Sequence, residues 1–304
     1  MSFNGICSKV ALSLCSVYGE TQEFIPDCYA RNAEGAGRKL IFNPSTLFLH
    51  IIVVLSIAFM IYQTNFKQWG PSRKQMLLIM SLYLVSIFLD FLLLSHFIPT
   101  TSKAFGVFVG FQIGTWCALF WSVLVLGMMP LFNIEDLRIM SYVTTAIIGL
   151  VVSIISILTA LNSGPFKSKT PTLVFVFFVV LNVVFVALTL CSQVYVVLVK
   201  TTDRYLLGVL GFGLVFFTLG IIMLVASTSI CNSSSGHYLD GIFLSTIFNL
   251  LTMMMVYKYW DSLNQQEVEF VREDEDIQKK KSFAHSGVSG QTSFANSQEP
   301  LMAR

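Results

Sequence analysis

Seven apolar runs dominate this chain of 304 residues, and each is long enough to cross a lipid bilayer as a helix. Inside lipid, every backbone amide must find its hydrogen-bond partner within its own helix. The chain is 55% hydrophobic and only 12% charged, whereas a soluble domain carries about 25% charged residues. The predicted fold class is therefore an all-α membrane protein, a seven-transmembrane-helix bundle. The runs cover residues 46–64, 76–98, 104–127, 139–161, 171–199, 205–229 and 239–258.

The runs divide the chain into three expected parts. These are an N-terminal segment over 1–45, a seven-helix transmembrane domain over 46–260, and a charged, largely disordered tail over 261–304. The short apolar stretch at 9–17 is interrupted by serines, so we interpret it as part of the mature N-terminal segment rather than as a signal peptide. A net charge of +2 gives no nucleic-acid footprint. We expect the lipid bilayer as a partner and no nucleic acid.

The basic residues predict which way the chain is oriented. With seven spans, the two termini lie on opposite sides of the membrane. Lysine and arginine are enriched in the loops after the first, third and fifth runs and in the tail. Because cytosolic loops carry an excess of these residues, this pattern predicts a luminal N-terminus and a cytosolic C-terminus. Three basic residues just ahead of the first run oppose that orientation, namely Arg31, Arg38 and Lys39.

Four of the six cysteines gather on the predicted luminal side, whereas the other two lie inside runs. An oxidising lumen favours one or two disulfides among the four, and the sequence leaves their pairing open. Free thiols are the alternative. Zinc is disfavoured because the spacings are wide and contain no CxxC pair. The four candidate disulfide cysteines are Cys7, Cys15, Cys28 and Cys231.

Polar side chains inside the runs form a second candidate site. Counted from the predicted luminal ends at ~1.5 Å per residue, Asp90 and Gln112 lie at similar depths. Asn249 and His50 lie in the same half of the bilayer. A carboxylate within a span indicates a functional site and needs a partner. The four residues could form an internal hydrogen-bond cluster that fixes helix packing, which is the simpler interpretation, or a proton path or a contact for another membrane protein.

Glycines recur every four residues in the third run, at Gly106, Gly110 and Gly114. Such a stripe lets two helix backbones approach closely. Packing within the bundle is the simpler interpretation, and contact with a partner helix is the alternative.

The stretch at the start of the seventh run places His237 and Asp240 three residues apart, on one helical face. No nucleophile lies in register with them, so we expect no catalytic residue, no metal and no cofactor. A metal site shared with His50 and His96 is an alternative. We interpret Asp240 as a negative charge placed near the start of the seventh helix, where the helix dipole is positive. We interpret His237 and Tyr238 as anchors at the membrane interface. The only N-glycosylation sequon begins nearby, at Asn232.

Four blocks of this chain resemble the fungal chitin synthase export chaperone family. They are ICSKVALSLCSV (6–17), CYARNAEGAGRKLIFNPSTLFLHI (28–51), FVGFQIG (108–114) and HYLDGIFLSTIFNLLTMMMVYKYWDSLNQQEVEF (237–270). The last block is the most specific, and its family motif includes His237, Tyr238, Asp240 and Trp260. Three features depart from the family pattern. No proline separates the first two cysteines, and the segment after the third run reads LFNIEDLR where the family usually carries a tryptophan-acidic-glycine element. The tail also differs, with EDED at 273–276.

The resemblance implies a non-enzymatic, multi-pass protein of the endoplasmic reticulum membrane. It implies a chaperone that helps chitin synthase, a polytopic membrane client, to fold and to leave for the cell surface, which supports cell wall chitin synthesis. Within the tail, KKK directly precedes Ser282, so control by phosphorylation is one expectation, and contact with vesicle coat proteins is another. The alternative functions are a seven-helix receptor, which would answer a ligand, and a transporter, which would carry substrate in vesicles.

Overall fold

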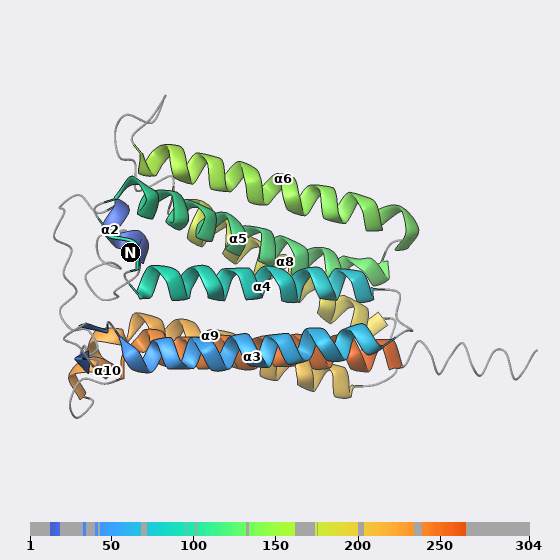
Figure 1. The fold of residues 1–304 in the computed structure, drawn as a ribbon. Helices are drawn as coiled ribbons and strands as arrows, with labels where there is room; N and C mark the ends of the chain where they lie inside the picture. Colours follow the sequence, from blue (N-terminus) through green and yellow to red (C-terminus); the bar gives the residue numbers. More distant parts are fainter. Residues whose placement is uncertain are drawn as a thin grey trace, which may run out of the picture. The chain divides into compact units, whose positions relative to one another are not determined.

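The computed structural model describes most of the membrane portion of the chain, and each described helix begins and ends at a defined residue (Figure 1). The described residues are 13–18, 33–34, 40–41, 43–67, 72–95, 97–100, 102–131, 134–161, 174, 176–199, 204–233 and 239–265. The elements in chain order are α2 (Ser13–Tyr18), β1 (Ala33–Glu34), β2 (Leu40–Ile41), α3 (Pro44–Phe66), α4 (Arg73–Leu94), α5 (Lys103–Met128), the 3-10 turn η1 (Met129–Leu131), α6 (Ile134–Ala160), the π-helix η2 (Val176–Val180), α8 (Leu181–Val199), α9 (Tyr205–Val225) and α10 (Ser227–Ser233). The final helix covers Gly241–Gln265.

Within the described residues, seven helices are long and apolar enough to cross a membrane. This confirms the predicted fold class. The orientation of the termini stays a prediction. Residues Met1–Tyr259 form one compact unit and Trp260–Arg304 a second. The predicted three-part division also stays a prediction, because most of 1–45 and of the tail lies outside the described residues.

Helix ends are where hydropathy and structure differ. The second run was expected to reach residue 98, but α4 ends at Leu94, and Ser95 donates its backbone N–H to the carbonyl of Phe91. The sixth run was expected to continue to 229, but α9 ends at Val225 and the chain starts a new short helix, α10. Apolar side chains lie on both sides of each break, so hydropathy does not mark where the backbone turns.

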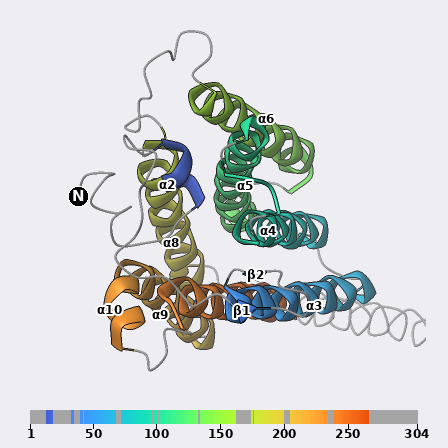
Figure 2. The same cartoon turned by 60° about the vertical axis from the view of Figure 1, so that its left-hand side comes forward.

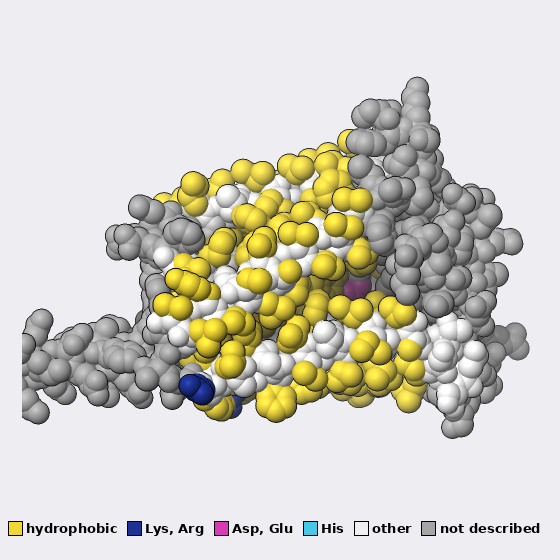
Figure 3. Space-filling view, turned by 180° about the vertical axis from the view of Figure 1, so that it is seen from behind, with side chains coloured by type: hydrophobic (Ala, Val, Ile, Leu, Met, Phe, Trp, Pro, Cys, Tyr) yellow, Lys and Arg dark blue, Asp and Glu magenta, His cyan; other side chains and the backbone are white. Residues whose placement is uncertain are grey.

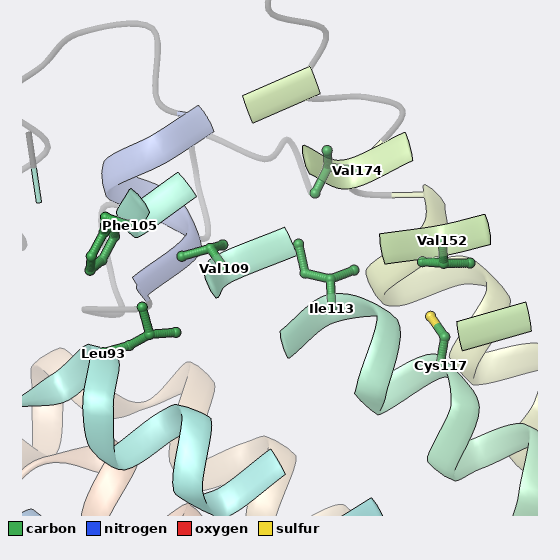
Figure 4. Packing of buried hydrophobic residues seen from close by; sticks show 7 residues of the cluster. All are labelled: Leu93, Phe105, Val109, Ile113, Cys117, Val152 and Val174. Atoms are coloured by element: carbon green, nitrogen blue, oxygen red, sulfur yellow. The ribbon is translucent and has the colours of Figure 1, made fainter. Parts of the chain in front are cut away.

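Helix α5 is the centre of the first unit. It packs against α4, α6 and α8, and α3 packs against α4 (Figure 2). In the most apolar stretch of each span, 61% of α5 is buried, against 17% of the η2–α8 span and 11% of α9. A buried cluster surrounds α5 (Figure 4) and consists of Leu93, Phe105, Val109, Ile113, Cys117, Val152 and Val174.

The glycine stripe of α5 faces α6. A Cβ atom added to Gly110 would lie 3.0 Å from the backbone nitrogen of Ile157, and one added to Gly114 would lie 2.6 Å from the carbonyl oxygen of Gly149. Real Cβ atoms essentially never come closer than 3.0 Å to another heavy atom, and 3.0–3.4 Å is already tighter than nine in ten real Cβ contacts. A Cβ added to Gly106 would lie 3.3 Å from the side-chain Cβ of Ala160, which is a tight contact with α6 but not a backbone one. The stripe therefore lets the α5 and α6 backbones touch, as small residues do between membrane helices.

Candidate functional site

The carboxylate of Asp90 in α4 is tied to α5 and, through α5, to the N-terminal helix α2. The side-chain amide of Gln112 donates a hydrogen bond to Asp90 Oδ1. The hydroxyl of Ser13 in α2 donates to Gln112 Oε1 over 3.1 Å. The side-chain amide of Gln112 in α5 thus links α4 to α2, two helices that lie far apart in the sequence.

The antiparallel pairing of α4 and α5 explains why these residues meet. Asp90 lies one turn before the C-terminal end of α4, and Gln112 lies in the third turn of α5, so both lie near the same end of the bundle. Gln112 is buried, but Asp90 is only partly buried. Asp90 Oδ2 accepts no hydrogen bond from any described residue. Figure 3 shows an acidic side chain recessed in a hollow of the apolar surface.

The other two predicted members of the cluster lie in separate environments. His50 is buried in α3, and its Nδ1 pairs with the carbonyl of Thr46, 2.7 Å away on the same helix. Asn249 in the final helix lies against Gly220 of α9. Among the described side chains, no hydrogen bond joins either residue to Asp90. The structure therefore brings together two of the four, Asp90 with Gln112.

A second polar cluster lies at the opposite end of α4, α5 and α6. The amide of Gln75 donates to the hydroxyl of Ser122 over 2.8 Å, and the hydroxyl of Ser141 donates to Gln75 Oε1 over 2.7 Å. All three side chains are buried. The sequence does not predict this cluster, because Gln75 lies one residue outside the predicted second run. Its only sequence signal is an uncharged amide directly after the basic pair Arg73–Lys74.

Replacing Ser141 with alanine should lower the melting temperature of the detergent-purified protein by a small, measurable amount. The change removes the donor to Gln75, and hydrogen bonds between membrane helices are worth about 0.6–1.7 kcal/mol. Ser81→Ala is the matched control, because the exposed Ser81 bonds only to the carbonyl of Leu77 in its own helix. Equal melting temperatures for the two variants would contradict a role of this cluster in stability.

Two of the four predicted cysteines are described, and both are disulfide-bonded. They are Cys15 in α2 and Cys231 in α10, and both are buried. Cys7 and Cys28 lie outside the described residues. Cys117 and Cys191, which lie within spans, are free.

Asp240 caps the final helix. Its Oδ1 accepts the backbone N–H of Phe243 over 2.8 Å, which satisfies one of the unpaired donors of the first turn. The next residue, Gly241, donates its N–H to the hydroxyl of Ser227, and a Cβ at this position would lie 2.7 Å from Ser227 Cα. Burial raises the pKa of the Asp240 carboxyl, and the bond from Phe243 opposes that rise.

The remaining predicted residues are spread over the end of α10 and the final helix. Asn232 is exposed within α10, so its side chain is accessible at that position. Trp260 is buried. His237 and Tyr238 lie outside the described residues, as does His96. No group of three or more potential metal ligands occurs among the described His, Cys, Asp and Glu residues.

The comparisons with known proteins agree along most of the chain. A family described as chitin synthase export chaperone matches residues 1–273. A protein of Cryptococcus neoformans var. neoformans serotype D named "Chitin synthase export chaperone" is 34% identical, covering 88% of this chain and 76% of that protein. Proteins of the same name from Aspergillus oryzae and Chaetomium globosum are also 34% identical, with 88% of this chain covered and 84% and 83% of theirs. No solved structure matches.

Proposed function

This chain belongs to the chitin synthase export chaperone family, and from that premise we propose that it helps a chitin synthase to fold in the endoplasmic reticulum and to leave for the cell surface. The observation that carries the proposal is the family match over residues 1–273, which takes in all seven spans. The client is a polytopic membrane protein, so a chaperone within the same bilayer can contact its helices directly. The role is not catalytic. The receptor and transporter alternatives are not favoured.

The proposed orientation has a luminal N-terminus and a cytosolic tail. Two observations support it. Cys15 and Cys231 are disulfide-bonded, which suits an oxidising compartment, and both lie on the side predicted to be luminal. Lys67 directly follows the first span and Arg73 begins the second, so both lie at the other end of these helices. Figure 3 shows Lys and Arg side chains together at one end of the apolar surface. Binding of the tail to coat proteins stays a prediction from sequence.

Deleting the gene should trap chitin synthase inside the cell. A fluorescently tagged synthase should shift from the cell surface to the endoplasmic reticulum, and cell wall chitin should fall, because the client is not released for export. Re-expression of the full chain should restore both. An unrelated polytopic plasma-membrane protein serves as the control and should still reach the surface. Normal synthase export in the deletion strain would refute the proposed function.

The orientation is tested separately on sealed microsomes. Protease added outside should remove an epitope at the end of the tail and leave an epitope ahead of α2 intact. The opposite result would invert the topology. It would also remove the compartment argument for the disulfides at Cys15 and Cys231 without affecting the family assignment.

A further inference from the structure

We propose that a disulfide between Cys28 and Cys231 covalently links the N-terminal segment to the loop between the sixth and seventh spans, and that Cys7 pairs with Cys15. The inference concerns the covalent structure of the chain and does not depend on the identity of the client. It goes beyond the sequence, which leaves the pairing of these four cysteines open.

The first argument is elimination among the six cysteines of the chain. Two of them lie within spans and are free thiols, so neither can be a partner. Cys15 and Cys231 are both disulfide-bonded. Only two arrangements remain. Either these two cysteines bond to each other, or each of them bonds to one of the two cysteines that lie outside the described residues, Cys7 and Cys28.

The second argument is that α2 and α10 lie too far apart for a bond between Cys15 and Cys231. Helix α2 packs on α5, where Val17 Cγ1 lies 3.8 Å from the position that a Cβ atom would take at Gly106. Helix α10 packs on α9 instead. Figures 1 and 2 show the two helices separated in both views, and a disulfide needs Cα atoms within about 6.8 Å of each other. Each cysteine therefore takes its partner from the residues ahead of β1.

The third argument places the start of α3 at the same end of the bundle as Cys231. Ser227 at the start of α10 accepts the backbone N–H of Gly241 over 3.1 Å, so α10 lies against the first residue of the final helix. The carboxyl of the preceding residue, Asp240, lies beside the side chain of Thr46 in the first turn of α3. One corner thus gathers α10, the final helix and the start of α3.

The hairpin of β1 and β2 leads from Cys28 to this corner. The two strands pair so that Ala33 lies opposite Ile41, which is three residues ahead of the first residue of α3. Cys28 precedes Ala33 by five residues, and five residues span at most about 18 Å. The chain is therefore long enough for Cys28 to reach Cys231.

This pairing leaves Cys7 for Cys15, which follows it by eight residues. The two bonds differ in what they join. The bond between Cys7 and Cys15 closes a short loop that ends in α2. The bond between Cys28 and Cys231 joins two segments with six spans between them, so both segments lie on the same side of the membrane, as a bond requires. It therefore holds together the corner of α3, α10 and the final helix.

The bond at Cys231 can form only after the loop behind the sixth span has been synthesised. The thiols of Cys28 and Cys231 lose two electrons and two protons in forming it. These reduce the disulfide of a thiol–disulfide oxidoreductase to a dithiol, which then leaves. The class of reaction that completes this chain is thus thiol–disulfide exchange in an oxidising compartment.

Peptide mapping of the purified full-length protein tests the pairing. Alkylation of the denatured, unreduced protein should block only the two thiols within spans. Lys9 and Tyr18 lie between the three N-terminal cysteines, so trypsin with chymotrypsin releases each cysteine in its own peptide. The peptide of Cys28 should be linked to that of Cys231. Linkage of Cys231 to either of the other two cysteines, or alkylation of Cys231 itself, would overturn the proposal.

A cleavable loop tests the same bond by gel electrophoresis. A specific protease site is inserted between the fifth and sixth spans, ahead of Arg204, so that cleavage separates Cys28 from Cys231 in the polypeptide. The two halves should stay together on a non-reducing denaturing gel and separate after reduction. Separation without a reductant would show that no disulfide joins the N-terminal segment to the loop that holds Cys231.

Two serine variants of the cleavable protein identify the cysteine. Cys28→Ser should let the halves separate without a reductant, whereas Cys7→Ser, the matched control, should leave them joined. The reverse result would pair Cys7 with Cys231 and contradict the proposal, while the family function, which gene deletion tests, would stand. The peptide map of the unaltered protein keeps the test decisive if either variant fails to accumulate.

Discussion

Gly110→Leu is expected to leave almost no folded protein in the membrane. A Cβ at this position would already lie 3.0 Å from the backbone nitrogen of Ile157 and 3.2 Å from its Cα. Backbone cannot move aside as a flexible side chain can, so leucine must force α5 and α6 apart. Overpacking costs typically about 1–3 kcal/mol, and here the separation would spread through the helix that forms the core of the unit. Steady-state abundance and melting temperature in detergent measure the loss.

Gly208→Leu in α9 is the control for that substitution. It makes the same chemical change in another span, but nothing lies within 4 Å of the Cβ position. This variant should accumulate normally. Equal losses at Gly110 and Gly208 would show that leucine harms the protein for a reason other than the α5–α6 contact. Full abundance of Gly110→Leu would show that the close contact of the two helices is not needed for folding.

The seven spans could be predicted because hydropathy reports burial in lipid, and every span must be apolar along its length. Hydropathy does not, however, show at which residue a helix ends. The final helix continues seven residues past the predicted end at 258, to Gln265, because polar residues can be helical without contributing to a hydropathy signal. The break at Ala226 between α9 and α10 has no hydropathy signal either. Ser227, directly after the break, accepts the backbone N–H of Gly241, which lies 14 residues further along the chain.

The site could be predicted only in part, because counting along a helix gives depth and not direction. Asp90 and Gln112 were placed at similar depths, and since α4 and α5 are antiparallel neighbours, the two side chains meet. His50 was placed in the same half of the bilayer, but it points to the carbonyl of Thr46 on its own helix. The angular position of a side chain depends on which helices are neighbours, and the sequence of a single chain does not state this.

The contact of α2 with Gln112 had no sequence signal at all. Ser13 lies in a six-residue helix within a segment whose sequence shows no span, and its partner is 99 residues away. Such a short helix is marginal by itself, so its position depends on what tethers it. Cys15, two residues from Ser13, is disulfide-bonded and buried. The disulfide and the hydrogen bond to Gln112 therefore act on the same helix.

Cys15→Ala should destabilise the protein far more than Ser13→Ala. Loss of a disulfide costs typically about 2–4 kcal/mol, which corresponds to roughly 3–6 °C in melting temperature for a chain of 304 residues. Loss of the Ser13 hydroxyl removes its hydrogen bond to Gln112, worth about 1 kcal/mol. Cys231→Ala should resemble Cys15→Ala, since Cys231 is also disulfide-bonded and buried in α10. Differential scanning fluorimetry of the purified variants in one detergent gives the comparison.

Cys191→Ala is the control for both cysteine variants, because Cys191 is a free, exposed thiol in α8. It should melt like the wild type. Reductant should lower the melting temperature of the wild type at least as far as Cys15→Ala does, and should lower Cys191→Ala by the same amount. If α2 is held mainly by its disulfide, Cys15→Ala should also break the hydrogen bond between Ser13 and Gln112. The hydrogen bond between Gln112 and Asp90 should remain. A wild-type melting temperature in Cys15→Ala would show that packing alone positions α2 and that its disulfide is dispensable for stability.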